Sequence, residues 1–355
     1  MISRIKLYNF RSYDLYEAEL GSGGTVIVGP NGTGKTNLLE AVYVALRGAS
    51  FRGSLGDCMR HDQAQTIIHL ETDDEVRRVQ LLRGNGGALN KEFIINDSRA
   101  KLLTRKHRLP VVLFEPNDLR LISSSPSRRR DFLDGLLARL DGQFETTLRA
   151  FHRTLLQRNE LLKRHEEGAA GWRDHLFAWD VKFVQLAAQV AQARAHFLYQ
   201  HEGQLRTLYA SLAGKDTPFS VEYLPSVPLE GYEQALLDRL GRARDYETAA
   251  GFTAAGPQRE DFVISLHGQP AVKVASRGEM RTIMLAFKLL ELERQTALHD
   301  TRPLILMDDV FSELDAEREK LLQETIRQHQ FIVTTTDARH RKDDCVIIAT
   351  KNHLA

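Results

Sequence analysis

The sequence predicts an α/β fold that is split by a mainly α-helical insertion. Near the start, the β-branched run Thr25–Val28 enters a glycine-rich loop, and residues 37–46 then place apolar side chains at helical spacing. Near the end, the apolar stretch within Leu304–Asp309 closes on two carboxylates. Between them, residues 128–214 contain no proline and carry no strong strand pattern, which predicts helices.

The N-terminal region before the insertion predicts several strands around that loop. Residues 2–10 place apolar side chains in a pattern that predicts an edge strand. Three further runs predict antiparallel strands and a fourth predicts a buried strand; in order, these are residues 66–70, 76–82, 93–95 and 111–114.

The helical insertion contains a long apolar seam. Large apolar residues alternate in steps of four and three at Trp172, Leu176, Trp179, Phe183, Leu186, Val190, Ala193 and Phe197. Such a heptad pattern fits a short antiparallel coiled-coil arm, and it equally fits two core helices of an ordinary bundle. Both alternatives remain open from the sequence.

The C-terminal third returns to an α/β pattern. Prolines and a glycine between residues 218 and 231 predict a joint or a small cap. Strands are then predicted at residues 262–266, 303–307 and 331–333, with helices at 280–293 and 313–329. We therefore expect a domain formed by residues 1–122 and 250–355, with residues 123–249 inserted as a helical arm and cap.

Composition excludes several classes of protein. The 355 residues hold only two cysteines, so a disulfide framework is excluded, and no Cys/His cluster has zinc spacing. The N-terminus lacks the apolar core of a signal peptide, and no run approaches the ~18 apolar residues of a membrane span. We expect a cytoplasmic protein with no membrane partner. The formal net charge of +1 does not exclude nucleic acid, because affinity for phosphate depends on local patches.

The glycine-rich loop fits the pattern G-x-x-x-x-G-K-[ST] in full, between a predicted strand and a predicted helix. Glycines let backbone N–H groups turn inward around a phosphate, and the helix N-terminus adds its positive dipole end. Lys35 is placed to bridge the β- and γ-phosphates, and the Thr36 hydroxyl is a candidate Mg²⁺ ligand. This pattern predicts ATP binding by the residues Gly29, Pro30, Asn31, Gly32, Thr33, Gly34, Lys35 and Thr36.

The paired carboxylates form the second half of this prediction. The strand end carries Asp308 to the edge of the sheet, where it can hold Mg²⁺. Asp309 is then placed to polarise a water against the γ-phosphate. Many buried strands end in a turn-forming aspartate, so the functional interpretation depends on the full phosphate loop elsewhere in the chain.

A third motif lies before the predicted helix at residue 280. Ser276 and Glu279 fit a capping box, which is an ordinary helix start. Together with the phosphate loop and the acidic strand, the Ser276–Glu279 segment also resembles an ATP-binding-cassette (ABC) head. In that architecture, the serine–glycine helix start of one subunit covers the γ-phosphate held by the other. The expected fold is then an ABC-type ATPase head with mixed sheets.

The whole chain resembles the RecF family of bacterial recombination-mediator ATPases, which are related to SMC heads. The resemblance is carried by Ile5–Tyr13, by the phosphate loop with Asn37–Ala41, by Pro126–Asp134 and by Met307–Arg318. SMC proteins carry hundreds of residues of coiled coil between the two halves of the head. The much shorter insertion here favours RecF.

The resemblance implies a head-to-head dimer closed by two ATP molecules, DNA binding in the ATP state and slow, DNA-stimulated hydrolysis. It also implies work with RecO and RecR to load RecA at single-strand gaps and to restart damaged replication. By position, Ser276, Gly278 and Glu279 would contact the opposing ATP, and Arg11 would approach the phosphates.

Two departures from cassette ATPases indicate weak turnover. Asp309 stands where a catalytic glutamate is common, and its side chain is one methylene shorter. The switch histidine is absent, and Thr335 is the nearest match.

A basic stretch is the candidate DNA surface. Between residues 101 and 130, two acidic residues accompany eight basic ones: Lys101, Arg105, Lys106, Arg108, Arg120, Arg128, Arg129 and Arg130. This stretch fits a sequence-independent phosphate contact, with Lys101, Arg105, Lys106, Arg128 and Arg129 as the chosen residues. Alternatively, the three consecutive arginines pair with carboxylates and seat the helical insertion.

Two other functions remain possible from the sequence. One is a scaffold protein whose degenerate cassette head binds nucleotide without meaningful hydrolysis. The other is a regulatory subunit of a transporter, which the helical insertion and the absent switch histidine disfavour.

Overall fold

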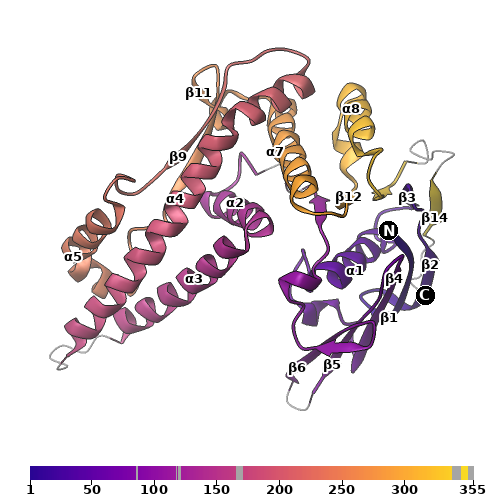
Figure 1. Cartoon of the computed structure of the whole chain (residues 1–355), viewed down its shortest axis with the longest axis horizontal. Helices are drawn as coiled ribbons and strands as arrows, with labels where there is room; N and C mark the ends of the chain where they lie inside the picture. Colours follow the sequence, from indigo (N-terminus) through magenta and orange to yellow (C-terminus); the bar gives the residue numbers. More distant parts are fainter. Residues whose placement is uncertain (85–86, 117, 119–120, 165–170, 338–344, 351–355) are drawn as a thin grey trace. The chain divides into compact units, whose positions relative to one another are not determined.

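The computed structural model describes residues 1–84, 87–116, 118, 121–164, 171–337 and 345–350 (Figure 1). The chain forms two compact units. The first comprises Met1–Asp118 and Leu292–Ala355, and the second comprises Leu119–Glu291. Among the described residues, no helix has an apolar stretch long enough to cross a membrane.

The first unit contains an antiparallel sheet with the strand order β2-β1-β4-β5-β6-β7. Residues 2–10 do form a strand, but β1 is interior to the sheet, so the predicted edge position is wrong. Strand β2 pairs with the outer side of β1. Strand β2 was not predicted, because only one of its residues, Tyr13, is buried and its sequence therefore lacks a clear apolar pattern. The strands are β1 (Ile2–Phe10), β2 (Tyr13–Glu19), β4 (Gln65–Thr72), β5 (Val76–Arg83), β6 (Leu89–Ile95) and β7 (Ser98–Ala100).

A second sheet in this unit is parallel, with the order β14-β3-β13-β12-β8. Its predicted strands are confirmed, whereas β14 was not predicted. The strands are β3 (Gly24–Val28), β8 (Val111–Phe114), β12 (Leu304–Asp308), β13 (Phe331–Thr335) and β14 (Val346–Ala349).

Helix α1 (Lys35–Arg47) shares one apolar core with both sheets of the first unit. Leu38 and Val42 of α1 pack in the same cluster as Ile68 of the antiparallel sheet and Leu306 of the parallel sheet. This core fixes the start of α1, and with it the glycine-rich loop, relative to the ends of the parallel strands. Near the C-terminus, a short 3₁₀ turn, η5 (Val310–Glu313), precedes α8 (Ala316–Ile326). Helix α8 starts later than predicted because the Asp315 carboxylate caps it by accepting from Arg318 N.

The second unit is mainly helical, as predicted for the insertion. Helix α5 packs against both α3 and α4, which favours a helix bundle over an isolated two-helix arm. The helices are α2 (Pro126–Leu140), α3 (Gly142–Lys163), α4 (Trp172–Ala213), α5 (Tyr232–Ala250), α6 (Ala271–Val274) and the first part of α7 (Arg277–Leu298).

The second unit extends further along the chain than the predicted insertion. Its C-terminal boundary lies at Glu291 inside α7, and not at residue 249. The reason is a small antiparallel sheet in the order β11-β10-β9, in which β9 (Phe219–Leu224) pairs with β10 (Asp261–Leu266). Strand β11 (Gln269–Pro270) completes it. This pairing holds the segment after α5 in the second unit, whereas residues 250–355 were all predicted to belong to the first domain. Strand β9 itself lies in the segment where only a joint or a small cap was predicted.

Candidate nucleotide-binding site

The glycine-rich loop leaves β3 and turns directly into α1. Gly34 has a φ of 95°, a left-handed conformation that side chains other than glycine rarely adopt. A Cβ atom on Gly29 would lie 2.1 Å from the Thr350 hydroxyl oxygen, so this position also requires glycine. The two glycines let the loop fold tightly against the end of the sheet and direct the N-terminus of α1 toward it.

Lys35 is the first residue of α1 and lies almost completely inside the loop. Its ammonium Nζ donates to the backbone carbonyls of Gly29 (2.7 Å) and Pro30 (2.8 Å). Burial lowers the pKa of Lys35 from its ordinary value, while Asp309 and Asp308 act in the opposite direction. The loop therefore concentrates a cation, a helix N-terminus and backbone donors at one point, which is an anion-binding arrangement.

Thr36 and Asp308 meet at this point, as the sequence predicts. The Thr36 hydroxyl donates to Asp308 Oδ1 at 2.8 Å, and Asp308 Oδ2 lies at 3.1 Å. They come together because β12 and β3 belong to one parallel sheet, whose carboxyl ends lie at one edge. The two oxygen ligands predicted for Mg²⁺ are thus neighbours next to the loop.

Thr334 completes this cluster and was not predicted. Its hydroxyl donates to Asp308 Oδ1 at 2.8 Å and accepts from the backbone N–H of Asp309 at 3.0 Å. The predicted residue was the neighbouring Thr335, whose carbonyl accepts from Gly29 N at 3.2 Å. Thr334 is the penultimate residue of β13 and pairs with Asp308 in the parallel register, which no local sequence pattern indicates.

Asp309 lies at the same edge of the sheet, directly after β12. It adopts a left-handed backbone conformation with a φ of 49°, which aspartate tolerates better than most residues. Its N–H is held by the carbonyl and the hydroxyl of Thr334, at 3.2 and 3.0 Å. This bracing fixes the start of the Asp309 side chain near the phosphate loop.

Arg11 lies in the turn between β1 and β2, and its guanidinium is paired with Glu40 of α1. Nε and Nη2 donate to the two carboxylate oxygens at 2.8 and 2.7 Å, and Glu40 is fully buried. This hydrogen-bonded pair raises the pKa of Arg11. The start of β2, directly after this turn, contacts the phosphate loop, because the Tyr13 hydroxyl donates to Gly34 O at 3.1 Å. The predicted contact of Arg11 with nucleotide phosphates stays a prediction.

The Ser276 motif belongs to the second unit, and its capping box is present. Ser276 N donates to Glu279 Oε2 at 3.0 Å, and Glu279 N donates to the Ser276 hydroxyl at 3.2 Å. The backbone hydrogen bond from Ser276 lowers the pKa of Glu279, and Lys215 lies 3.5 Å from its carboxylate. A Cβ atom on Gly278 would meet only the Ser276 hydroxyl oxygen, at 3.9 Å. Packing among the described residues therefore does not require glycine at this position.

The predicted basic stretch is divided between the two units. In the first unit, Lys101, Arg105 and Lys106 are exposed around the 3₁₀ turn η3 (Arg105–His107). In the second unit, Arg128 is exposed, whereas Arg129 is bound to Asp261 of β10 through two contacts, at 3.0 and 2.5 Å.

The other arginines of the stretch differ as well. Arg130 donates to the carbonyl of Glu260 at 2.8 Å, and Arg120 lies outside the described residues. The alternative of carboxylate pairing thus holds for Arg129. Its partner lies within the second unit.

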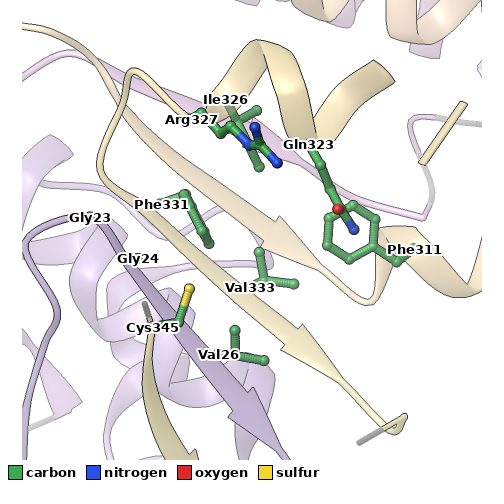
Figure 2. Close-up of a pocket in the computed structure, with 10 residues that line it drawn as sticks. All are labelled: Gly23, Gly24, Val26, Phe311, Gln323, Ile326, Arg327, Phe331, Val333 and Cys345. Atoms are coloured by element: carbon green, nitrogen blue, oxygen red, sulfur yellow. The ribbon is translucent and has the colours of Figure 1, made fainter. Parts of the chain in front are cut away.

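A separate cavity of about 430 Å³ lies in the first unit against β3, β13 and α8 (Figure 2). Figure 2 shows Val26 and Val333 of the sheet beside Phe331, with Gln323 and Arg327 along α8 and its C-terminal end. The phosphate loop does not line it. This cavity was not predicted, because the mostly apolar residues that line it have the pattern of ordinary core positions.

Comparison with known proteins assigns the family. The family model described as the RecF/RecN/SMC N terminal domain matches residues 1–353. Among similar proteins, the DNA replication and repair protein RecF of Moorella thermoacetica is 34% identical over 347 residues, which cover 95% of this chain and 90% of the relative. The RecF of Roseiflexus castenholzii is 31% identical over 369 residues, which cover 94% and 93%.

Solved structures agree with this assignment. The recombination mediator protein RecF bound to ATP, of the RecFOR pathway, matches with a TM-score of 0.86 and 27% identity over 99% of this chain and 96% of that one. An SMC head domain from Pyrococcus furiosus matches with a TM-score of 0.53 and 16% identity, covering 99% and 94%, which shows a shared fold. The chain belongs to the RecF family, and its fold is that of an SMC- and ABC-type ATPase head.

Proposed function

We propose that this chain is a cytoplasmic, ATP-dependent DNA-binding protein of recombinational repair and replication restart. In this proposal, ATP joins two copies head to head, and the dimer clamps DNA without sequence preference. With RecR and RecO, it helps to load RecA at single-strand gaps. The observation that carries the proposal is the meeting of Lys35, Thr36 and Asp308 at one edge of the parallel sheet, in a chain of the RecF family.

The proposed chemistry assigns a role to each residue of that edge. The loop N–H groups and Lys35 bind the phosphates, and Lys35 exchanges its two carbonyl partners for phosphate oxygens. Thr36 and Asp308 would hold Mg²⁺, because their oxygens already lie 2.8 Å apart and oxygen ligands suit this ion. Bound Mg²⁺ would neutralise phosphate charge. Asp309 orients the attacking water and accepts its proton.

The surface around Ser276 supports a second copy as the partner that completes the site. Gly278 occupies the first turn of α7 although nothing within 3.9 Å in the described chain demands a glycine. Glycine costs roughly 1 kcal/mol relative to alanine in a helix, and it permits close approach of another molecule. Val272 and Val274, just before this turn, are exposed. These features fit a surface that a nucleotide and a second head would cover.

The decisive experiment measures dimerisation by light scattering with a non-hydrolysable ATP analogue, with and without duplex DNA. Wild type is expected to dimerise. Lys35→Met is expected to lose about 10- to 100-fold in nucleotide affinity, since it removes charge-assisted hydrogen bonds. Ser276→Arg is expected to bind nucleotide normally and remain monomeric. A wild type that stays monomeric with saturating analogue would refute the shared site.

The second candidate function is a nucleotide-binding scaffold without meaningful hydrolysis. The observation that favours it is the short side chain of Asp309, on a residue whose backbone N–H is held by Thr334. Phosphate release separates the two. The ATPase proposal expects slow turnover that rises with DNA and stays well below a motor's rate of about 10 s⁻¹. The scaffold expects wild type to release no more phosphate than Lys35→Met under either condition.

A further inference from the structure

Strand β9 forms one edge of the small sheet in the second unit. The strand order is β11-β10-β9, so β9 pairs with β10 on one side only, and among the described residues no other strand pairs with it. Figure 1 shows β9 beside α4, before the chain continues into α5. Pro218 and Pro225 flank the strand and limit the edge to six residues.

The register shows which backbone groups face outward from this edge. His267 N donates to Pro218 O at 2.9 Å, one step beyond the pair Phe219–Leu266, so this position belongs to the hydrogen-bonded pairs. Because such pairs recur every second residue in antiparallel strands, Ser220, Glu222 and Leu224 point their backbone groups toward β10. Their alternates, Phe219, Val221 and Tyr223, point their N–H and C=O groups away from the sheet.

These outward backbone groups have no partner in the described chain, although Phe219, Val221 and Tyr223 are only 5%, 5% and 7% exposed. Within the described chain, no hydrogen bond to the N–H or C=O of Phe219, Val221 or Tyr223 is formed. Three donors and three acceptors at two-residue spacing are what an added extended strand recognises.

A groove runs along this edge on the side of α4. It has a volume of about 480 Å³, and Val221 and Tyr223 of β9 and Leu198 and Tyr199 of α4 are among the residues that line it. Tyr199 is 81% exposed, which is unusual for a large aromatic residue. Since side chains alternate across a strand, an added strand would place every second side chain in this groove.

The charges around the groove indicate which residues an added strand would carry between the side chains that enter the groove. Glu222 lies on the exposed face of β9 and lines the groove, and the exposed Glu230 follows the lining residue Leu229. Neither carboxylate has an ion-pair partner among the described residues. A strand paired with β9 would therefore gain from lysine or arginine opposite Glu222.

We propose that the β9 edge and this groove dock an extended segment of another protein, in which apolar residues alternate with basic ones. The segment adds antiparallel to β9 as a further strand. Its apolar residues pair with Phe219, Val221 and Tyr223, and their N–H groups face β9. Its basic residues lie on the exposed face with Glu222. This site is independent of the proposed ATP chemistry.

The test uses the full chain and a fluorescein-labelled peptide, Lys-Val-Lys-Val-Lys-Val, with binding followed by anisotropy. Two modified peptides carry N-methyl groups on the three valines or on the three lysines. In the proposed register, valine methylation removes the hydrogen bonds to β9 and weakens binding at least about tenfold. Lysine methylation leaves these bonds intact, so this peptide is expected to bind.

Protein variants locate the site. Glu222→Lys is expected to weaken binding of the unmodified peptide about fivefold, through lost attraction and new repulsion. Tyr199→Ser is expected to weaken it as well. Phe177→Ser, which removes another exposed aromatic residue of α4, is the matched control and is expected to bind as wild type does.

Three results would overturn the proposal. They are the absence of saturable binding, an equal effect of both methylation patterns, and unchanged binding by Glu222→Lys together with Tyr199→Ser. Self-association of the chain that Val221→Pro abolishes would also overturn it, because the edge would then serve a second copy. Proline at residue 221 removes an outward N–H and leaves the bonds to β10 in place.

Discussion

The two units hold their charged groups in different ways. In the first unit, Lys35, Thr36 and Asp308 gather where parallel strands end, at the surface of a sheet. In the second unit, the guanidinium of Arg158 is buried among three helices and a loop. It binds Asp180, Glu247 and the Thr253 hydroxyl, each at 2.7 Å. The first arrangement can exchange its partners for a ligand, whereas the second is closed to solvent and serves the packing.

A second buried arginine repeats the closed arrangement. Arg194 of α4 donates to both oxygens of Asp134 on α2 at 2.7 Å and to Pro257 O at 2.8 Å. Burial disfavours its charge, but the ion pair with Asp134 outweighs this effect and keeps the pKa of Arg194 above its ordinary value. Charged clusters therefore indicate a functional site only where geometry leaves them open to a ligand.

Removing Arg158 is expected to give the largest effect on stability. Arg158→Met leaves the carboxylates of Asp180 and Glu247 buried without a cation, which costs about 3–5 kcal/mol in the free energy of unfolding. Urea unfolding followed by tryptophan fluorescence measures this loss. Both tryptophans, Trp172 and Trp179, lie in α4 and so report on the second unit.

The matched control for this change is Arg153→Met, an exposed arginine of the same helix, expected to change stability by less than about 0.5 kcal/mol. Nucleotide affinity should remain that of wild type, since the phosphate loop belongs to the other unit. A loss below about 1 kcal/mol for Arg158→Met would contradict the idea of a tightly coupled buried cluster.

Cys58 gives a matching probe for the first unit. It is fully buried, and burial, together with Glu40, raises the pKa of its thiol to about 12. In a Cys345→Ser background, iodoacetamide at pH 8 is expected to modify native Cys58 at least about 100-fold more slowly than the urea-unfolded chain, because the thiolate is the reactive form. Equal rates would mean that the region around Cys58 opens readily.

The same thiol gives a pH dependence whose sign follows from the raised pKa. The unfolded chain releases the thiol proton near the ordinary pKa of 9.0, whereas the native state keeps it until about 12. The unfolded state is therefore favoured as the pH rises from about 9 toward 12, and stability falls. Cys58→Ala should show a smaller loss than wild type between pH 8 and pH 10. An identical loss would assign the dependence to other groups.

The smallest expected effect concerns the divided basic stretch. Arg105→Glu with Lys106→Glu is expected to lower duplex DNA affinity about tenfold at fixed low salt, because exposed cations contact phosphates. Lys163→Glu with Arg164→Glu carries the same charge change at the C-terminal end of α3 in the second unit and is the control. Arg129→Gln should instead lower stability, since it leaves Asp261 without its partner. Unchanged DNA affinity in the first variant would remove this surface from the proposal.

Much of the candidate site follows from the sequence because its residues lie in contiguous motifs. The loop, its lysine and the Asp308–Asp309 pair occupy fixed positions relative to a strand end, so local pattern and geometry agree. Thr334 was missed because a threonine at a strand end has no distinctive pattern, and its role appears only when β12 and β13 lie side by side. Glu40 was missed because a glutamate within a helix normally faces solvent, whereas here it is buried against Arg11.

The fold likewise contains elements that the sequence predicts and pairings that it does not. Periodicity predicted the buried parallel strands and the long helices, whose burial pattern repeats along the sequence. It did not predict the interior position of β1, the pairing of β9 with β10, or the two carboxylate partners of Arg158, which are 22 and 89 residues away along the chain. Long-range pairing of this kind leaves no local period.

The sequence by itself determined the class of the fold, the phosphate loop and the acidic strand end, because backbone conformation and chemistry set residue types at short, fixed spacing. Only the tertiary structure decided which charged side chains are bound in ion pairs and which are exposed. Arg129 is bound to Asp261, whereas Lys106 is exposed, although the sequence predicted both as DNA-contacting residues. The physical reason is that desolvation and ion pairing depend on distance in space, which a linear chain does not record.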